Sequence, residues 1–310
     1  MLPLLYRAAT WPLAPLAIVY LERRRKRGKE DAQRFRERRG VPGAARPKMA
    51  LLWIHAASVG EANAMLALIE RLLQTRPALE ILVTTGTVTS AHLLESRLPP
   101  RARHQFVPVD LPRWVARFLD HWRPDLALWV ESELWPNLIL ATHARGVPLV
   151  LVNGRLSAGS YARWQRWPGL IGPILGAFSL CLAQDEEQAR RFRGLGAREV
   201  GMVGDLKAAA AALPVDRSQL AELGRQIKAR PLWLAASTHA GEEEIAAHVH
   251  RQVVGSHPRL LTIIVPRHPA RGDAIHAMLT AQGLGVARRR RGEPITDQTD
   301  VYLADTMGEL

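Results

Sequence analysis

The chain has 310 residues, of which 47% are hydrophobic, so it can bury the core of one large domain or two ordinary ones. Its single cysteine, Cys181, excludes an internal disulfide and a cysteine-based metal cluster. The net charge of +13 is concentrated, because residues 1–48 hold thirteen Lys/Arg and four Asp/Glu, a net of +9. The rest of the chain carries only +4, so no basic face of the kind that binds nucleic acid is indicated.

The first 21 residues form an apolar segment with one charge, Arg7, and the basic run ERRRKRGK follows at once. This length suffices to span a bilayer, with the basic run on the cytoplasmic side. Three prolines weaken a straight spanning helix, so an interfacial anchor held by anionic lipids and a soluble packed helix stay open. A cleaved signal peptide fits poorly, because no basic region precedes the apolar run. We predict a membrane anchor at 1–21, then a basic linker at 22–48, with the main domain in the cytoplasm.

From residue 49 onward, apolar runs alternate with segments of helical periodicity. Strands are predicted at 50–56, 80–87, 104–110, 125–131, 148–156, 179–185 and 198–207. Helices are predicted at 61–77, 89–98, 111–124, 134–146 and 185–196, and a long aromatic stretch covers 161–178. Strands that are apolar throughout, with helices between them, indicate a parallel sheet covered on both faces.

The pattern restarts near residues 213–217. Helices are predicted at 218–230, 241–258 and 272–284, and strands at 231–238, 259–269 and 300–306. The charged run ARRRRG at 287–292 is interpreted as a solvated loop. We therefore predict an α/β protein with two parallel-sheet domains, 49–212 and 213–310, facing a cleft that binds ligands at the carboxyl ends of the strands.

The residues suited to chemistry each lie at the carboxyl end of a predicted strand or just after it. In chain order they are Glu61, Glu131, Glu133, Asn153, Arg155, Lys207, Ser237, Thr238, His239, Pro266, Arg267, His268 and residues 305–309. Structural roles stay open for them: a glutamate in a first helical turn caps the helix, and an arginine after a strand can be a surface charge. The stretch STHAGEEE predicts a capping box in which Ser237 or Thr238 caps a helix, and the N–H groups of that turn also suit a phosphate.

Several classes of site are not indicated. The eleven histidines show no metal-ligand spacing, so no metal site is predicted. Neither a phosphate-binding loop of the ATPase type nor a dinucleotide-binding glycine motif occurs in the sequence.

Seven short motifs together resemble one enzyme family. HAASVGE, ESELWPN, NGRLS, GDLK, STHAGEE, VPRHPAR and DTMGEL occur in the order seen in the 3-deoxy-D-manno-octulosonic acid (Kdo) transferases. The resemblance covers almost the whole chain, including the apolar N-terminus with its basic run. It implies a glycosyltransferase of the GT-B fold that acts in lipopolysaccharide biosynthesis at the cytoplasmic face of the cell inner membrane.

The resemblance also implies a reaction. Kdo passes from CMP-Kdo to the lipid A precursor lipid IVA with inversion at the anomeric carbon, and neither a metal nor another cofactor is required. By motif position, Glu61 is the general base, and Glu131 and Lys207 stabilise the transition state. The segments that bind CMP-Kdo include Ser237, Thr238, Pro266, Arg267, Met307, Gly308 and Glu309, while Glu133 and Arg155 rank lower in the same cleft.

The sequence departs from the family pattern in two places. Asp205 precedes LK where members have a small or amide residue, and alanines follow Lys207 in place of aromatic and acidic residues. Members also extend beyond DTMGEL with a glycine-rich segment that binds the donor. From this we expect the second domain to be incomplete, and the chain as given to bind donor poorly and to be weakly active or inactive.

Two other hypotheses fit the same pattern. A different GT-B transferase would use a UDP-sugar and ignore CMP-Kdo. A membrane-bound, non-catalytic remnant would bind lipid without releasing CMP.

Overall fold

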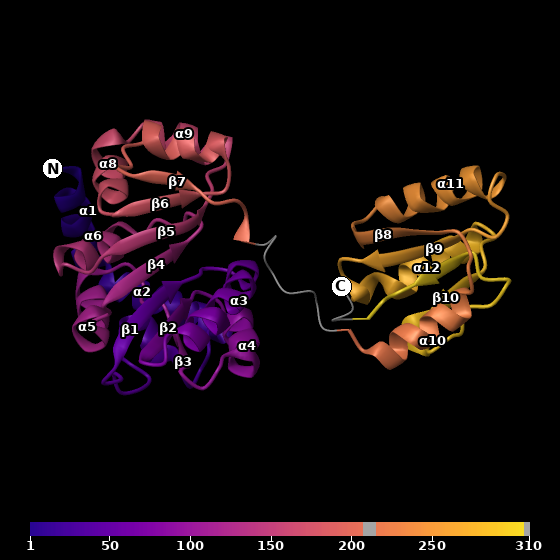
Figure 1. The fold of residues 1–310 in the computed structure, drawn as a ribbon, viewed down its shortest axis with the longest axis horizontal. Helices are drawn as coiled ribbons and strands as arrows, with labels where there is room; N and C mark the ends of the chain where they lie inside the picture. Colours follow the sequence, from indigo (N-terminus) through magenta and orange to yellow (C-terminus); the bar gives the residue numbers. More distant parts are fainter. Residues whose placement is uncertain (207–214, 307–310) are drawn as a thin grey trace. The chain divides into compact units, whose positions relative to one another are not determined.

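The computed structural model describes residues 1–206 and 215–306, which fall into two compact units, Met1–Ala211 and Ala212–Leu310. Figure 1 shows a parallel sheet with flanking helices in each unit. The predicted α/β class with two parallel sheets is confirmed. Each unit is described by itself below.

The sheet of unit 1 has seven parallel strands in the order β3-β2-β1-β4-β5-β6-β7. The strands are β1 (Ala50–His55), β2 (Leu79–Thr85), β3 (Ala102–Phe106), β4 (Leu126–Val130), β5 (Leu149–Gly154), β6 (Leu180–Ala183) and β7 (Val200–Met202). The helices that connect them are α3 (Val59–Thr75), α4 (Val88–Arg97), α5 (Pro112–Trp122), α6 (Pro136–Ala144), α7 (Ala158–Gln165), α8 (Pro168–Gly176) and α9 (Glu186–Gly194). The aromatic stretch 161–178 is thus mostly two short helices.

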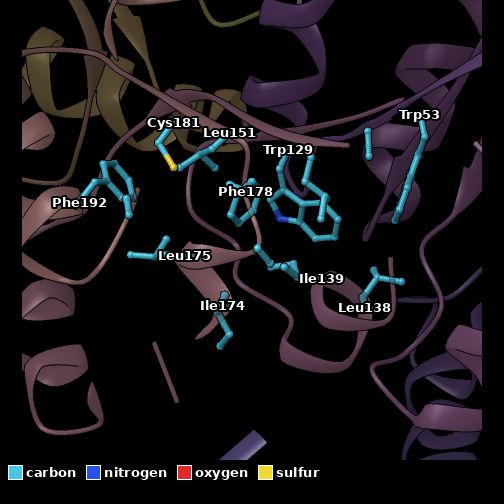
Figure 2. Close-up of a cluster of buried hydrophobic side chains, with 14 of the residues drawn as sticks. Trp53, Trp129, Leu138, Ile139, Leu151, Ile174, Leu175, Phe178, Cys181 and Phe192 are labelled. Atoms are coloured by element: carbon cyan, nitrogen blue, oxygen red, sulfur yellow. The ribbon is translucent and has the colours of Figure 1, made fainter. Parts of the chain in front are cut away.

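Successive residues of β1 point to opposite faces of this sheet, and each face has its own core. Leu52 and Ile54 pack with α3 and α4, whereas Leu51 and Trp53 pack with α5 and α6. Figure 2 shows part of the second core, with Trp53, Trp129 and Cys181 labelled. The ring centroids of Trp53 and Trp129 lie 5.4 Å apart in an edge-to-face arrangement, and Cys181 belongs to the same buried cluster of aliphatic and aromatic side chains. Truncating either tryptophan to alanine is expected to cost about 3–5 kcal/mol of unfolding free energy.

The N-terminal segment is helical from Leu2 to Lys26, as α1 (Leu2–Thr10), a 3-10 turn (Trp11–Leu13) and α2 (Ala14–Lys26). By length and composition these 25 residues suffice to cross a membrane. One face of the segment packs on unit 1, with its inward residues at helical spacing: Leu2, Tyr6, Thr10, Ala14, Ala17, Ile18 and Leu21. The other face exposes large apolar side chains, here called the apolar row: Leu4, Leu5, Trp11, Leu13, Leu16, Val19 and Tyr20.

Much of the segment predicted as a basic linker, residues 22–48, packs against the sheet and helices of unit 1. Glu37 accepts two hydrogen bonds from Arg34 at 3.0 Å and one from the Phe106 N–H at 2.8 Å. Gly40 has φ 73, and a Cβ there would lie 2.0 Å from the carbonyl oxygen of Trp114, so only glycine fits. These contacts fix the basic segment against β3 and α5.

Unit 2 has a four-stranded parallel sheet in the order β10-β11-β9-β8. Its strands are β8 (Leu232–Thr238), β9 (Leu261–Pro266), β10 (Val286–Arg288) and β11 (Val301–Leu303). Its helices are α10 (Arg217–Ile227), α11 (Glu242–Val254) and α12 (Gly272–Ala281). Apolar residues of α11, α12, β9 and β11 form one of its cores.

The interpretation of residues 287–292 as a solvated loop is wrong for its first residues. Ala287 and Arg288 belong to β10, and Arg288 is 2% exposed. Its guanidinium donates to Asp305 Oδ2 at 3.0 Å and to Asp273 Oδ1 at 2.7 Å, so a buried charge is paired on two sides. The two partners lie 17 and 15 residues away in the sequence. The run of four arginines alone therefore gives no sign that one of them is buried.

Candidate functional site

Glu61 lies at the N-terminus of α3, directly after β1. The Ser58 hydroxyl accepts from the Glu61 N–H at 3.3 Å and donates to Glu61 Oε1 at 2.8 Å, while the Ala57 N–H donates to Oε2 at 2.8 Å. Glu61 therefore does cap its own helix, as its structural alternative proposes. Each carboxylate oxygen still has a lone pair available to a further proton donor.

The pKa of Glu61 is raised above its ordinary value. Burial is the main cause, since the residue is only 8% exposed, and the negative charges of Glu131 and Glu133 add to it. The hydrogen bonds from Ser58 and Ala57 act in the opposite direction. No Lys or Arg forms a salt bridge with Glu61 among the described residues; its carboxylate accepts hydrogen bonds there from Ala57 and Ser58. A raised pKa moves a carboxylate toward the range useful for taking a proton.

The sheet topology brings Glu61 and Glu131 to one place. Strands β1 and β4 are neighbours, and the strand order reverses between them, so their carboxyl ends flank the switch point where sheets of this type bind ligands. Glu61 follows β1 and Glu131 follows β4. The negative charge of Glu131 helps to raise the pKa of Glu61, which agrees with this placement.

The loop after β4 has a constrained backbone. Glu131 adopts φ 56, an uncommon conformation for a residue with a side chain, and its N–H donates to the Val152 carbonyl at 3.0 Å. Residues 131 and 132 form a turn, so the loop is not a simple extended segment, and the carboxylate of the exposed Glu133 accepts from Trp135 Nε1 at 2.8 Å. The side chain of Arg155 is exposed, and its carbonyl accepts a hydrogen bond from the Ser132 hydroxyl.

Asn153 is a further polar residue at this edge, at the end of β5. It has φ 56, is 1% exposed, and its Oδ1 accepts from the Leu206 N–H at 3.0 Å. Its Nδ2 is buried without a hydrogen-bond partner among the described residues. Asn153 therefore holds the segment that leads into residue 207. The sequence indicates a special role for Asn153, because it is a polar residue in an apolar strand and immediately precedes a glycine.

The Asp110–Asn137 pair was missed by the sequence interpretation. The Asp110 carboxylate accepts from the backbone N–H groups of Asn137 and Leu138 at 3.0 and 2.8 Å, and so caps α6. It also accepts from the Tyr6 hydroxyl of α1 at 3.1 Å. The Asn137 amide donates to the Asp110 carbonyl at 2.7 Å and to Thr10 Oγ1 at 3.0 Å. Burial raises the pKa of Asp110 to about 6.

In unit 2 the candidate donor-binding residues lie at the carboxyl ends of two paired strands. Thr238 at the end of β8 is in register with Pro266 at the end of β9, and the Arg267 N–H donates to the Thr238 carbonyl at 3.0 Å. Ser237 has φ 59, and the register shifts around it, so the strand bulges here. The side chains of Ser237 and Arg267 are exposed, which leaves both accessible to a ligand.

The predicted capping box of α11 is wrong in form. The helix is capped by Gly241 without a side-chain hydrogen bond. The Thr238 hydroxyl instead donates to Glu243 Oε1 at 2.8 Å, and Arg271 donates to both oxygens of Glu243 at 2.8 and 2.9 Å. The cap therefore lies three residues after Thr238.

Four predicted site residues, Lys207, Met307, Gly308 and Glu309, lie outside the described residues. Within the described part of the chain, no group of three or more His, Cys, Asp or Glu side chains is placed to hold a metal ion.

Comparison with known proteins gives a consistent result. Residues 33–210 match the sequence profile of the family described as 3-deoxy-D-manno-octulosonic-acid transferase (kdotransferase). The chain is 38% identical to a probable mitochondrial 3-deoxy-D-manno-octulosonic acid transferase of Arabidopsis thaliana, over 99% of this chain and 70% of that protein. It is 34% identical to the 3-deoxy-D-manno-octulosonic acid transferase of Rickettsia bellii, over 99% of this chain and 73% of that one.

A solved structure extends the comparison to the fold. The UDP-GlcNAc 2-epimerase of Neisseria meningitidis, bound to UDP-GlcNAc, superposes with a TM-score of 0.55 at 13% identity, over 84% of this chain and 73% of that chain. At this identity the likeness concerns the fold alone, which is of the GT-B type.

Proposed function

Because the chain belongs to the Kdo transferase family, we propose that it transfers Kdo from CMP-Kdo to lipid IVA in lipopolysaccharide biosynthesis. The observation that supports this most directly is Glu61: a buried carboxylate with a raised pKa, at the switch point of the sheet, beside two further carboxylates.

Glu61 acts as the general base of an inverting displacement. Its carboxylate takes the proton of the acceptor hydroxyl while that oxygen bonds to the anomeric carbon of Kdo. The bond from this carbon to the phosphate oxygen breaks, and CMP leaves with the electron pair. The cap bonds from Ser58 and Ala57 fix the direction of the carboxylate, so little reorganisation is needed at the moment of transfer.

The remaining site residues receive the roles that their motifs have in the family. Glu131 lies across the switch point from Glu61 and helps to stabilise the transition state together with Lys207. Arg267, with Pro266, Ser237 and Thr238, holds the CMP phosphate at the carboxyl ends of β8 and β9. Met307, Gly308 and Glu309 complete the donor segment. Glu133 and Arg155 line the acceptor side.

The N-terminal segment attaches the enzyme to the cytoplasmic face of the inner membrane by lying on the bilayer. One of its faces is hydrogen-bonded and packed on unit 1 along its length, which does not suit a helix that leaves the protein to cross the bilayer. The apolar row is left to enter the acyl region, and the exposed basic residues after it meet anionic headgroups.

The donor test measures CMP release from CMP-Kdo by the purified chain in micelles that contain lipid IVA. CMP release that depends on lipid IVA is expected, at the weak rate that the sequence predicts for the chain as given. Turnover of UDP-sugars without turnover of CMP-Kdo would favour another GT-B transferase, and binding of lipid IVA without CMP release would favour a non-catalytic protein.

The membrane test replaces Leu16 and Val19 by glutamate and measures flotation with phosphatidylglycerol vesicles. Loss of flotation is expected, because two charges would have to enter the acyl region. Leu220→Glu, at an exposed leucine of α10, is the control. Unchanged flotation of the double variant contradicts the attachment through the apolar row.

A further inference from the structure

A pocket of about 360 Å³ lies in unit 1 where α1 meets α5, α6 and α8. Figure 1 shows α1 beside α6 and α8 in this unit, and contacts join α1 to both helices. The lining is mainly aliphatic: Pro3, Leu4, Pro112, Val115, Ala116, Leu140, Ala141, Ala144 and Pro173, with Arg7, Asn137 and Arg145. We call it the α1 pocket. None of the residues proposed to bind donor or acceptor lines it; Asn137, the partner of Asp110, does.

The polar groups of the pocket offer little to a polar ligand. Both N–H groups of the Asn137 amide are occupied, by the Asp110 carbonyl and by Thr10 Oγ1. Arg145 donates to Asp120 Oδ1 at 2.7 Å and to the Ala141 carbonyl at 3.1 Å. The interior therefore suits hydrocarbon, because a buried polar group without partners would lose its hydrogen bonds to water.

The wall formed by α1 is held in place. The hydrogen bonds from Tyr6 to Asp110 and from Asn137 to Thr10 tie the helix to unit 1 on the side next to the pocket. At the start of α1, a Cβ on Gly169 would lie 2.9 Å from Leu2 Cδ1, so Leu2 packs closely on α8. Because these contacts fix α1, the pocket is a preformed space.

The surface around the pocket is continuous with the apolar row. A shallower hollow lined by Leu4, Arg7, Ala8 and Trp11 shares Leu4 and Arg7 with the pocket. The Arg7 side chain is exposed and has no salt bridge among the described residues. The Arg113 guanidinium lies over the Trp11 ring at 4.9 Å. An apolar space whose rim carries uncompensated positive charge is complementary to an anionic amphiphile.

We propose that the α1 pocket binds one acyl chain of an anionic phospholipid, whose phosphate is bound by Arg7. This rests on the proposed attachment of the N-terminal segment to the membrane and assigns it a specific lipid. Such a lipid would orient unit 1 on the bilayer, whereas the apolar row alone fixes only its depth. The acyl chain leaves one apolar phase for another, so its affinity comes from close packing against the pocket walls, and the phosphate supplies selectivity.

The test uses native mass spectrometry of the chain in detergent micelles doped with phosphatidylglycerol or with phosphatidylcholine. We expect one retained phosphatidylglycerol per chain and weaker retention of phosphatidylcholine. Ala144→Trp fills the pocket from an exposed position on α6, and His143→Trp, an exposed neighbour that does not line the pocket, is its control. Retention is expected to fall about tenfold in Ala144→Trp only.

The charge is tested with Arg7→Gln against Arg23→Gln, an exposed arginine outside the pocket. Arg7→Gln is expected to remove the preference for phosphatidylglycerol, and Arg23→Gln to keep it. The proposal is overturned if Ala144→Trp and His143→Trp retain phosphatidylglycerol equally. It is also overturned if Arg7→Gln still prefers phosphatidylglycerol to phosphatidylcholine. Vesicle flotation without lipid retention overturns the pocket and leaves membrane attachment standing. Lipid retention without flotation overturns the proposed attachment and leaves the pocket standing.

Discussion

Two buried glutamates occupy similar positions in the two units, but their surroundings differ. Glu61 and Glu243 each belong to the first turn of a helix that follows a parallel strand, and each accepts a hydrogen bond from a Ser or Thr hydroxyl. Glu243 also binds Arg271 through both oxygens; although burial opposes ionisation, these bonds lower its pKa. Glu61 forms no salt bridge with a Lys or Arg within residues 1–206 and 215–306, and burial raises its pKa. A carboxylate that is already neutralised stabilises the fold, whereas one left without a cation can accept a proton.

The largest expected effect is that of Glu61→Gln. Losing a general base typically reduces the rate of transfer by about 10²–10⁴-fold, while the amide preserves the shape of the cap. CMP release from CMP-Kdo in the presence of lipid IVA is the measurement. Glu70→Gln, at an exposed glutamate of the same helix, is the control and is expected to retain full activity. Ordinary turnover by Glu61→Gln would reduce Glu61 to a helix cap.

Asp110 extends the comparison to a third buried carboxylate, which also lacks a salt bridge among the described residues. Its pKa is raised from 3.8 to about 6, so its protonated form is favoured in the folded state. Its stabilising contribution is therefore present below pH 4 and is lost as the pH rises toward 6. The loss corresponds to about 3 kcal/mol of unfolding free energy.

The measurement is urea denaturation between pH 4 and pH 7, comparing the chain with Asp110→Asn. The variant is expected to lack this part of the pH dependence. An identical pH dependence in both proteins would show that Asp110 does not titrate in this range.

Glu243→Gln is expected to lower stability, in contrast to Glu61→Gln, which is expected to lower activity. It removes the charge that Arg271 pairs with, and the loss of charge-assisted hydrogen bonds is expected to cost about 1.5–3 kcal/mol of unfolding free energy. The denaturation midpoint of unit 2 measures this. Glu244→Gln, at an exposed position of the same turn, is expected to change stability by less than about 0.5 kcal/mol. If Glu61→Gln destabilised the protein more than Glu243→Gln, the distinction between the two glutamates would fail.

The smallest effect concerns Ser58→Ala. The hydrogen bond from Ser58 lowers the pKa of Glu61, so its removal is expected to raise that pKa further and to move the acidic limb of the pH–rate profile to higher pH. Loss of the cap is expected to cost about 1 kcal/mol. Thr87→Ala removes the corresponding cap of α4, so it should cost similar stability without moving the profile. If the pH–rate profile shifted equally in both variants, the hydrogen bond from Ser58 would not be the cause of the shift.

The alternation of strands and helices was predictable because the strands are apolar throughout and the helices have clear periodicity. The burial of particular charged residues could not be predicted from the sequence. Glu37 and Arg288 lie within charged runs that read as exposed, yet each is buried because partners far along the chain, Phe106 and Asp305, meet it. The candidate site follows the same division. Glu61 after β1 could be found from the sequence, whereas the coupling of Asp110 to Asn137 and α1 depends on tertiary packing.

The burial of Cys181 has a practical consequence. Cys181 is 1% exposed, and burial raises the pKa of its thiol to about 12, so it does not form the reactive thiolate at neutral pH. Thiol-directed labels are therefore not expected to react with the protein before a second cysteine is introduced. One cysteine introduced at Leu16 or Ala144 would carry a spin label or fluorophore alone, and the depth and lipid contact of the N-terminal segment could be read from native protein without first removing a residue from the core.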